Sequence, residues 1–598
     1  MAVFEVGIDK QFRSFSAAIN AATDGDEIKI YPAFYDECFE CEKNLTFTGV
    51  PDDIKDFKTY PQLYNSEEDY YTNITGECSF SNIIFTEKDT TELADYEKII
   101  SGAKLTDEII EKYLREELED NHLEGFCLVV KSESRFENCH FIGARNYGVV
   151  VDLNNTKKSP VFTNCGFYLN YYDGIYVTGK KTSQASTFHN CKMAYNGNGI
   201  YGGNFHLIEC ELTNNFSDGI LFAANESKVE KCSIHHNGCG IGGEEKGSLS
   251  INETKIRTNG AEGIFLRGSS KILMNKSGVC WNQDAVIMGE KSSLVATDCT
   301  FKINNGDAFL CTGKSELTLQ TCTVSENEEK GIEATEKAKV SIFESRILNN
   351  ADDSVFGSKS AEIKMLESDC LENRTAVHLK GKSCGIINTC AFASNHDCEM
   401  FITENAKCEV ENSHLITKQL PEKHKKNERA VAVMCADKSE LHFYHCKFRS
   451  EKTKDTILAL LMGEANAKFA ECNFQDAENG IVVTGMAGCD VKNSKFRGCL
   501  NLDIYKRSKL ASWVDVENTE ISDETKKKLA VKDYEIAREL LPKLNGEERK
   551  IITEYYNLDE ENPEEEYRLT GEELALYFNI PVKRVERAFN KLAQLAEE

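Results

Sequence analysis

The chain has 598 residues, and 70 lysines and arginines against 98 aspartates and glutamates give a formal net charge of −28 at pH 7. So negative a surface argues against non-specific binding to nucleic acids or anionic membranes, and any DNA contact would need a local basic patch. The N-terminus lacks the features of a signal peptide and no apolar run is long enough to span a membrane, so we expect a cytoplasmic protein with no membrane partner.

Residues 1–50 predict an N-terminal cap and the first coils of a repeat. Residues 12–22 are amphipathic at helical spacing, and Gly25-Asp-Glu-Ile-Lys-Ile30, Tyr35 and Asn44-Leu-Thr-Phe-Thr-Gly49 follow. This order resembles the beginning of the pectin-lyase-like superfamily, whose members form right-handed parallel β-helices. The predicted helix would cover the apolar interior of the first coil, which would otherwise meet water.

Residues 51–138 are expected to form early coils with a helical insertion at about 89–121. Cys78-Ser-Phe80 and Cys139-His-Phe141 both have the form small residue, any residue, apolar residue. The segment between them is charged, and its apolar residues recur at helical spacing. The insertion is either a decoration of one coil or a docking surface for a protein partner.

From Cys139 to Thr519 the small-x-apolar phrase recurs about every 22 or 23 residues. Because side chains alternate along a strand, the small and the apolar residue face the same side. A period of this length with β-type runs is the signature of a solenoid. We predict a regular right-handed parallel β-helix over residues 139–522, with roughly eighteen coils in the whole chain. By the resemblance stated above, the pectin-lyase-like fold extends to about residue 522.

An asparagine stands five residues after the small residue in consecutive coils. Asparagine tolerates left-handed backbone geometry and hydrogen-bonds its neighbours, so a column of asparagines fits a sharp bend that is repeated in every coil. The predicted structural ladder comprises Asn170, Asn196, Asn215, Asn237, Asn259, Asn282, Asn304, Asn327, Asn350, Asn373 and Asn395.

The chain contains 24 cysteines, many of them at the small position of the repeat. Such cysteines are placed by coil geometry and behave as small apolar residues, so we expect free thiols and a reducing compartment. Cys38-x-x-Cys41 falls in a probable strand, where the two thiols would point to opposite faces. The sequence predicts no metal site and no cofactor.

A helical pattern replaces the repeat after residue 522. We expect a helical linker over 523–545 and a separate domain over 546–598, where Thr570 and Glu573 form a capping box. The latter resembles region 4 of bacterial sigma factors, in Leu569-Thr570-Gly-Glu-Glu-Leu-Ala575 and in Val582-Lys-Arg584, which opens the last helix.

That resemblance implies a helix-turn-helix that binds DNA, RNA polymerase or another protein. The residues that would face the partner are Lys583, Arg584, Arg587 and Lys591. The segment has 14 acidic and 7 basic residues, which is a poor balance for DNA binding. DNA contact and protein docking therefore both stay open.

Carboxylates recur just before the strand that follows the asparagine: Asp218, Glu262, Asp284, Asp307 and Asp353. Neighbouring coils lie about 4.8 Å apart, so Glu262, Asp284 and Asp307 are candidates to share a proton or Ca²⁺ and to act in catalysis. Asn198, Cys239 and Lys330 occupy the same position in other coils, which fits a tolerant turn site instead.

Aromatic residues cluster on two consecutive coils and could stack on sugar rings or pack in the wall of the helix. The candidate ligand-stacking residues are Tyr171, Tyr172, Tyr176, Tyr195 and Tyr201.

Our first hypothesis is a non-catalytic scaffold, whose solenoid or helical insertion binds a protein partner and whose C-terminal domain engages DNA or transcription machinery. The second is a carbohydrate-active enzyme, a polysaccharide lyase or glycoside hydrolase, that uses the stacked carboxylates. A third is a C-terminal domain that docks the protein into an assembly.

Overall fold

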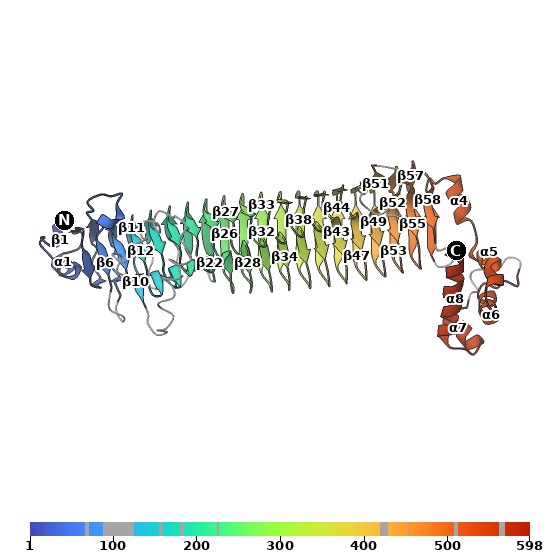
Figure 1. The fold of residues 1–598 in the computed structure, drawn as a ribbon, viewed down its shortest axis with the longest axis horizontal. Coiled ribbons are helices and arrows are strands. Elements are labelled where there is room, and N and C mark those ends of the chain that lie inside the picture. The colour runs from blue at the N-terminus through green and yellow to red at the C-terminus, as the bar shows by residue number, and fades with distance from the viewer. Residues whose placement is uncertain are drawn as a thin grey trace. The chain divides into compact units, whose positions relative to one another are not determined.

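A computed structural model of the chain describes residues 1–65, 71–87, 125–154, 159–179, 185–223, 226–418, 429–451, 454–507, 512–560 and 569–597. The chain divides into two compact units, Met1–Glu329 and Lys330–Glu598. In each unit, parallel strands from successive turns stack into three sheets, here called sheets A, B and C (Figure 1). The fold is the right-handed parallel β-helix that the repeat predicted. The expected insertion at about 89–121 lies outside the described residues.

The strands of unit 1 are short and follow one another in the order A, B, C. Sheet A contains β1 (Val3–Val6), β2 (Glu27–Ile30), β5 (Thr46–Gly49), β8 (Ser79–Ser81), β11 (Arg135–Glu137), β14 (Val161–Thr163), β17 (Ser186–His189), β20 (Phe205–Ile208), β23 (Glu226–Glu230), β26 (Ser248–Asn252), β29 (Lys271–Asn275), β32 (Ser293–Thr297) and β35 (Glu316–Gln320). Sheet B contains β3 (Phe34–Asp36), β6 (Gln62–Tyr64), β9 (Ile84–Thr86), β12 (His140–Ile142), β15 (Gly166–Tyr168), β18 (Lys192–Ala194), β21 (Glu211–Thr213), β24 (Ser233–His235), β27 (Lys255–Arg257), β30 (Gly278–Cys280), β33 (Thr300–Lys302) and β36 (Thr323–Ser325). Sheet C contains β4 (Glu40–Cys41), β7 (Asn73–Ile74), β10 (Phe126–Val130), β13 (Tyr147–Asp152), β16 (Asp173–Thr178), β19 (Asn198–Gly202), β22 (Asp218–Phe222), β25 (Cys239–Gly243), β28 (Ile264–Leu266), β31 (Val286–Met288) and β34 (Phe309–Cys311).

Unit 2 continues the same order of strands. Its sheet A contains β38 (Lys339–Phe343), β41 (Glu362–Leu366), β44 (Cys384–Asn388), β47 (Lys407–Glu411), β50 (Glu440–Tyr444), β53 (Asn466–Ala470), β56 (Gly488–Lys492) and β59 (Trp513–Glu517). Its sheet B contains β39 (Arg346–Leu348), β42 (Asp369–Leu371), β45 (Ala391–Ala393), β48 (His414–Thr417), β51 (Lys447–Ser450), β54 (Asn473–Gln475) and β57 (Lys495–Arg497). Its sheet C contains β37 (Ile332–Ala334), β40 (Val355–Gly357), β43 (Thr375–Leu379), β46 (Cys398–Ile402), β49 (Ala430–Cys435), β52 (Thr456–Leu461), β55 (Asn479–Val483) and β58 (Leu502–Lys506).

The core lies inside the coils and is built by alternation along each strand. In β26, Leu249 and Ile251 are buried, whereas Ser248 and Ser250 face outward. In the next strand, β27, Ile256 is buried between Lys255 and Arg257. Ile264 and Leu266 of β28 complete the turn, which thus adds five apolar side chains to the interior and presents polar ones on the outer faces.

The ladder asparagines are buried at the bend between sheets B and C. The Oδ1 atom of Asn304 accepts hydrogen bonds from the backbone N–H and the Nδ2 atom of Asn282, one turn earlier, at 3.0 and 3.2 Å. We expected the asparagine itself to have left-handed geometry. The structure instead gives this geometry to the residue before it, such as Trp281 at φ 55° and Ile303 at φ 54°. The asparagines therefore stabilise the bend by bonding to the adjacent turn.

The first coil is covered by α1 (Phe15–Ala21), and η1 (Phe57–Thr59) lies in an early loop. The Ser14 hydroxyl caps α1 by accepting a hydrogen bond from the Ala17 N–H at 3.2 Å. Phe15 is fully buried and its ring stacks at 5.5 Å on Phe39 and at 6.4 Å on Phe47 of β5. The helix therefore closes the apolar interior of the coil.

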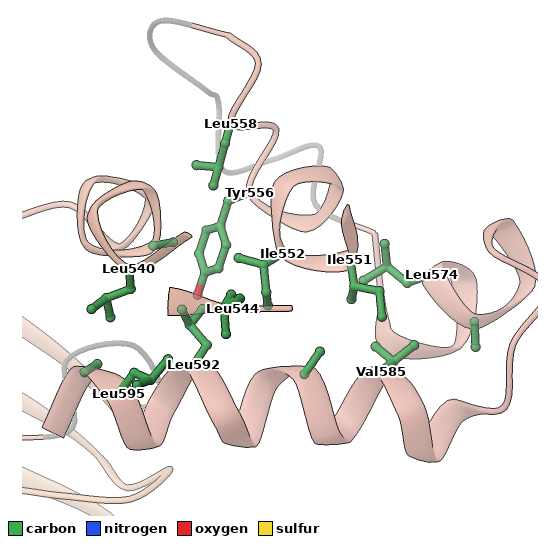
Figure 2. Close-up of a cluster of buried hydrophobic side chains, with 14 residues drawn as sticks. Leu540, Leu544, Ile551, Ile552, Tyr556, Leu558, Leu574, Val585, Leu592 and Leu595 are labelled. Atoms are coloured by element: carbon green, nitrogen blue, oxygen red, sulfur yellow. The ribbon is translucent and has the colours of Figure 1, made fainter. Parts of the chain in front are cut away.

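The C-terminal helices of unit 2 are α4 (Asp523–Leu529), α5 (Asp533–Leu540), η3 (Leu541–Lys543), α6 (Gly546–Tyr555), α7 (Gly571–Tyr577) and α8 (Val582–Glu597). Figure 2 shows that Leu540 and Leu544 share one apolar core with Ile552 of α6 and Leu592 of α8. Residues 533–544, which we expected to be a linker, are thus part of this helical bundle. Among the described residues, no helix is both long and apolar enough to span a bilayer.

Candidate functional site

The three predicted carboxylates Glu262, Asp284 and Asp307 lie on successive turns, close to the start of sheet C strands. The Asp284 Oδ1 atom accepts a hydrogen bond from the Asp307 backbone N–H at 2.8 Å. Burial raises the pKa of Asp284, and the charge of Glu262 adds to the shift. In the described ranges, no group of three or more His, Cys, Asp or Glu side chains is placed to hold a metal ion.

The same row of side chains begins at Asp173 of β16 and Asp218 of β22, with Asn198 of β19 between them. The Asn198 Nδ2 atom donates to Asp173 Oδ1 at 2.8 Å, and its Oδ1 atom accepts from the Asp218 backbone N–H at 2.9 Å. Burial raises the pKa of Asp173 to about 7, to which the charge of Asp218 contributes. Burial also raises the pKa of Asp218 to about 6. The Asn198 amide therefore links the Asp173 carboxyl group to the backbone of Asp218, and both aspartates have pKa values raised toward neutral pH.

A glycine packs closely against Asp218 on the outer face. Gly242 of β25 takes the position of Leu221 one turn later in the register. A Cβ atom at Gly242 would lie 3.0 Å from Asp218 Oδ1 and 2.9 Å from the Leu221 side chain. The Asp218 and Leu221 side chains thus fill the space that a side chain at position 242 would need.

A row of stacked tyrosines adjoins these carboxyl groups on the outer face of sheet C. The ring centroids of Tyr147 and Tyr176 are 5.0 Å apart, and those of Tyr176 and Tyr201 are 5.4 Å apart. Tyr147 is the register partner of Asp173 on the adjacent strand. Tyr172 is 52% exposed, and its ring centroid lies 6.1 Å from that of Tyr147. The aromatic row therefore lies beside Asp173, whose own side chain is buried.

The other two predicted stacking residues differ in their accessibility. Tyr171 contacts the ring of Tyr172 edge-on, with the centroids 5.0 Å apart. Tyr195 is 1% exposed and belongs to a buried cluster with Ile142 and Tyr168, so it offers no ring to a ligand. Tyr195 is in fact the left-handed residue before Asn196, at φ 60°.

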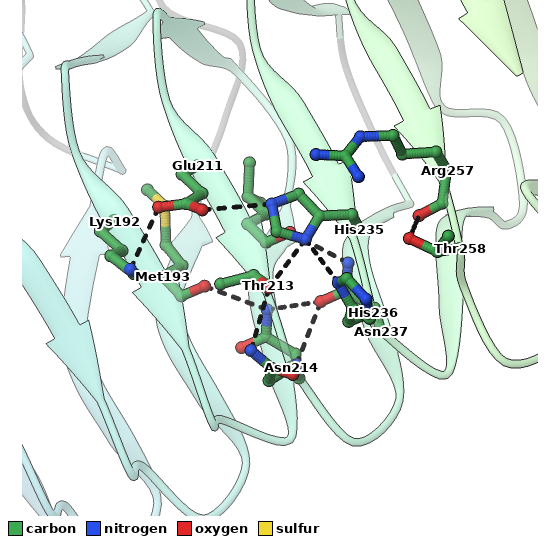
Figure 3. A network of polar contacts seen from close by, with 12 residues as sticks. Lys192, Met193, Glu211, Thr213, Asn214, His235, His236, Asn237, Arg257 and Thr258 are labelled. Atoms are coloured by element: carbon green, nitrogen blue, oxygen red, sulfur yellow. Dashed lines mark hydrogen bonds and ion pairs between the residues drawn. The ribbon is translucent and has the colours of Figure 1, made fainter. Parts of the chain in front are cut away.

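A polar network lies on the outer face of sheet B (Figure 3). Lys192 Nζ lies 3.1 Å from Glu211 Oε2, and His235 Nε2 lies 3.1 Å from Glu211 Oε1. The His235 hydrogen bond, together with the charge of Lys192, lowers the pKa of Glu211 to about 2. The other ring nitrogen of His235 lies 2.7 Å from His236 Nδ1 and 3.1 Å from Thr213 Oγ1. A carboxylate so firmly ionised is an anchor between turns rather than a proton donor.

Unit 2 contains a different arrangement around Asp353. His378 Nδ1 lies 2.9 Å from Asp353 Oδ2, and Arg374 Nη2 lies 3.2 Å from Asp353 Oδ1. Arg374 Nε also pairs with Asp352 at 2.9 Å. The His378 ring stacks on Phe401 with the centroids 4.8 Å apart. The Asp353 carboxylate is thus bound from both sides by basic groups.

The four basic residues predicted to face a partner all lie on α8. Lys583, Arg584 and Arg587 are exposed and Lys591 is half-buried, whereas Val585, Ala588 and Leu592 face the core. Arg584 Nη1 pairs with Glu547 of α6 at 3.0 Å. Residues 578–581 join α7 to α8, and Asn579 has a left-handed φ of 49°.

Tyr147 and Asp173 were not predicted as site residues from the sequence, and Asp218 and Asn198 were named only as repeat positions. A signal was available, because Asp173 and Asp218 each stand three residues after a ladder asparagine, two turns apart. Tyr147 occupies the matching position one turn before Asp173.

Comparison with known proteins gives a family and a set of distant structural similarities. The family model described as "Right handed beta helix region" matches residues 67–204, 198–344 and 307–461. No curated protein matches the sequence. The chain is similar to the pectate lyase Pel9A with 14% identity and a TM-score of 0.29, over 54% of this chain and 76% of that one. It is similar to the PL6 family alginate lyase AlyGC with 9% identity and a TM-score of 0.18, over 85% of this chain and 98% of that one.

This chain is similar to a viral protein with an equally low identity and TM-score. The siphovirus 9NA tailspike receptor binding domain has 8% identity and a TM-score of 0.17, over 77% of this chain and 76% of that one. Similarity this low bears on neither substrate nor mechanism. The stacked turns and the family model, which matches most of the chain, agree: the protein belongs to the right-handed beta-helix family.

Proposed function

We propose that the outer face of sheet C in unit 1 binds a carbohydrate chain and that the protein is a glycoside hydrolase. The observation that carries this proposal is the row Tyr147, Tyr176 and Tyr201 beside the hydrogen-bonded Asp173 and Asp218. Aromatic rings present apolar faces with polar edges, which suits stacking on sugar rings. Carboxyl groups with raised pKa values at the same place supply acid and base chemistry.

In this proposal the two carboxyl groups have different roles. Asp173, with a pKa of about 7, gives its proton to the glycosidic oxygen as the bond to the sugar carbon breaks. Asp218, with a pKa of about 6, takes a proton from the water that attacks that carbon. β16 and β22 are two strand spacings apart, about 10 Å, which favours an inverting reaction with a water molecule between the groups.

The first experiment incubates the full chain with neutral and uronate-containing polysaccharides. Hydrolysis releases reducing ends, whereas elimination by a lyase also produces unsaturated ends that absorb ultraviolet light. We expect reducing ends without unsaturated ends, and we expect Asp218→Asn to abolish their release. Tyr176→Leu is expected to weaken binding in affinity electrophoresis because it removes the central ring of the row.

Each other result points to a different function. Unsaturated products would replace the hydrolase by a lyase. Binding that depends on Tyr176 but releases no products would make the protein a non-catalytic carbohydrate-binding scaffold. If the protein neither binds nor cleaves any of the polysaccharides, the proposal is refuted.

A second candidate function rests on the C-terminal bundle. The exposed Lys583 and Arg587 on α8, after a four-residue turn, support a role in binding duplex DNA or a protein of the transcription machinery. The test is duplex-DNA binding by the full chain over a salt series, compared with a Lys583→Gln/Arg587→Gln variant. Binding that weakens with salt and is lost in the variant favours a DNA contact. If neither the wild-type chain nor the variant binds DNA, the result favours docking to a protein. The same conclusion follows if the two bind DNA equally well.

A further inference from the structure

Three basic side chains gather without acidic partners on the outer face of sheet B in unit 1. Lys255 and Arg257 belong to β27 and Lys302 belongs to β33. Within the part of the chain that the structure describes, none of the three forms an ion pair with a carboxylate. Several basic residues elsewhere on sheet B do pair across turns, as Lys192 does with Glu211 at 3.1 Å and Arg449 with Asp476 at 3.3 Å. The turns from β27 to β33 instead bring three unpaired basic side chains close together.

The register of the strands explains why these cations converge. Lys255, Gly278 and Thr300 are aligned across the three strands, as are Arg257, Cys280 and Lys302. The strand between the two basic ones, β30, thus presents only the small residues Gly278 and Cys280. Burial raises the pKa of the Cys280 thiol, whereas the charges of Lys302, Arg257 and Lys255 all oppose that shift. The three cations therefore lie around one small side chain.

The small residues form the floor of a groove of about 740 Å³. This volume falls within the range of roughly 300–1,000 Å³ that is common for ligand sites. Glu253 and Lys231 lie on its rim, and Lys231 pairs with Glu209 at 3.9 Å. The groove is basic although the whole protein has a net charge of −28.

An exposed indole ring completes the groove. Trp281 directly follows Cys280, lines the groove and is 49% exposed. Its backbone is fixed in the left-handed bend at φ 55°, where its N–H donates to the Ile303 carbonyl at 2.9 Å. A large aromatic residue rarely adopts such a φ, and the neighbouring turns hold it there. A flat ring is thus presented beside three unpaired cations.

We propose that this groove binds a nucleoside phosphate, with Lys255, Arg257 and Lys302 holding the phosphate oxygens and Trp281 stacking on the base. Three converging cations balance a phosphate that carries more than one negative charge better than they balance a single carboxylate. A base is planar and stacks on an indole, as bases do on aromatic side chains of proteins that bind single strands. The ligand is a free nucleotide or a nucleotide within a single strand. This site is distinct from the sheet C surface and does not depend on the hydrolase proposal.

Tryptophan fluorescence of the full chain tests the proposal directly. The protein has two tryptophans, so a Trp513→Phe variant makes Trp281 the only reporter. We expect ADP to quench this fluorescence saturably and inorganic phosphate to compete with ADP without quenching. Arg257→Gln and Lys302→Gln should each weaken ADP binding by about tenfold or more, as expected for a lost charge-assisted hydrogen bond. Lys276→Gln is the matched control, because Lys276 is exposed on the same turn as Cys280 but does not line the groove.

The role of the ring is tested separately by calorimetric titration of ADP into Trp281→Asn. Asn214 occupies the equivalent left-handed bend in an earlier turn, so asparagine should be accommodated without loss of the fold. We expect the variant to lose the advantage of ADP over inorganic phosphate. Tighter binding of oligothymidylate than of ADP identifies a single strand as the source, and the reverse identifies a free nucleotide. The proposal is overturned if neither ADP nor oligothymidylate quenches the fluorescence saturably. It is also overturned if the Arg257, Lys302 and Lys276 variants bind ADP with equal affinity.

Discussion

Sheet C has an aspartate at the same position in both units, three residues after a ladder asparagine, but the two carboxyl groups differ in charge. In unit 1, Asp173 has Asn198 as its side-chain partner, and burial raises its pKa to about 7. In unit 2, burial alone would raise the pKa of Asp353, but the hydrogen bond and charge of His378 and the charge of Arg374 lower it. The backbone supplies the position, and the side chains of adjoining turns decide whether the carboxyl group holds a proton.

This difference assigns different roles to equivalent residues. A carboxyl group that holds a proton near pH 7 can give it to a substrate. A carboxylate bound by a histidine and an arginine is held in its charged form and anchors the turns around it. The same distinction separates Asp218 in sheet C from Glu211 in sheet B, whose pKa values are about 6 and about 2.

The largest expected effect is that of Asp173→Asn on carbohydrate cleavage. Asparagine keeps the acceptor for Asn198 but has no proton to give, so the rate should fall by about 100-fold or more while binding is retained. Reducing-end release measures the rate, and affinity electrophoresis measures the binding. Asp284→Asn is the control, because its side-chain oxygen can still accept from the Asp307 N–H. An unchanged rate for Asp173→Asn would mean that the acid lies elsewhere.

The scaffold that both units share can be broken at Asn304, three residues before Asp307. Leucine at this position leaves the buried N–H and Nδ2 donors of Asn282 without an acceptor, so Asn304→Leu should lower the free energy of unfolding by about 3 kcal/mol. Urea unfolding followed by circular dichroism gives this value. Asn305→Leu, at the exposed neighbouring position, should change it little. Equal stability of the two variants would refute the ladder's role.

The anchor in unit 2 can be removed with Asp353→Ala. The variant leaves His378 and the partly exposed Arg374 without their buried partner, and we expect a loss of about 2 kcal/mol at pH 7, discounted for the exposure of Arg374. Urea unfolding at pH 7 measures the loss. Asp397→Ala, which removes the more exposed partner of Arg374 at 3.6 Å, is the control and should have little effect.

The last prediction is that Asp173→Asn gains stability at high pH, whereas Asp353→Asn loses stability there. Because the pKa of Asp173 rises from 3.8 to about 7 on folding, the folded state loses stability as the pH rises through this interval. Asp173→Asn removes this cost, so the variant should be more stable than wild type at pH 8 by about 2 kcal/mol and equally stable below pH 4. Asp353→Asn should be less stable than wild type at pH 8, with the difference vanishing in acid. The same sign for both variants at pH 8 would remove the distinction between the two sites.

The sequence predicted the β-helix well because each column depends on local periodicity. The small residues from Cys139 onward and the asparagines from Asn170 onward recur about every 22 or 23 residues, which is visible without any tertiary structure. The residue with the unusual φ was harder to identify, because the position before the asparagine holds side chains as different as Leu169, Thr258 and Trp281.

The sites were less predictable because they depend on contacts between turns that no repeat pattern fixes. Burial and the charge of Asp218 raise the pKa of Asp173, whereas the hydrogen bond from Asn198 lowers it, and these residues belong to different strands. The groove at Trp281 arises because glycine and cysteine happen to stand between two basic turns. Residues 533–544 look like a linker in the sequence, and only the three-dimensional packing shows that they complete the C-terminal core.

The asparagine ladder has a consequence for how the length of the protein can vary. Each asparagine meets the same partner, another asparagine one turn away, whichever turn it occupies. Insertion or deletion of one complete repeat would leave every remaining asparagine paired. The spacing of paired asparagines also varies, from 26 residues between Asn170 and Asn196 to 19 between Asn196 and Asn215, so the loops of a turn absorb smaller changes. The protein can therefore be lengthened or shortened by whole turns, or within the loops of one turn, without loss of the column.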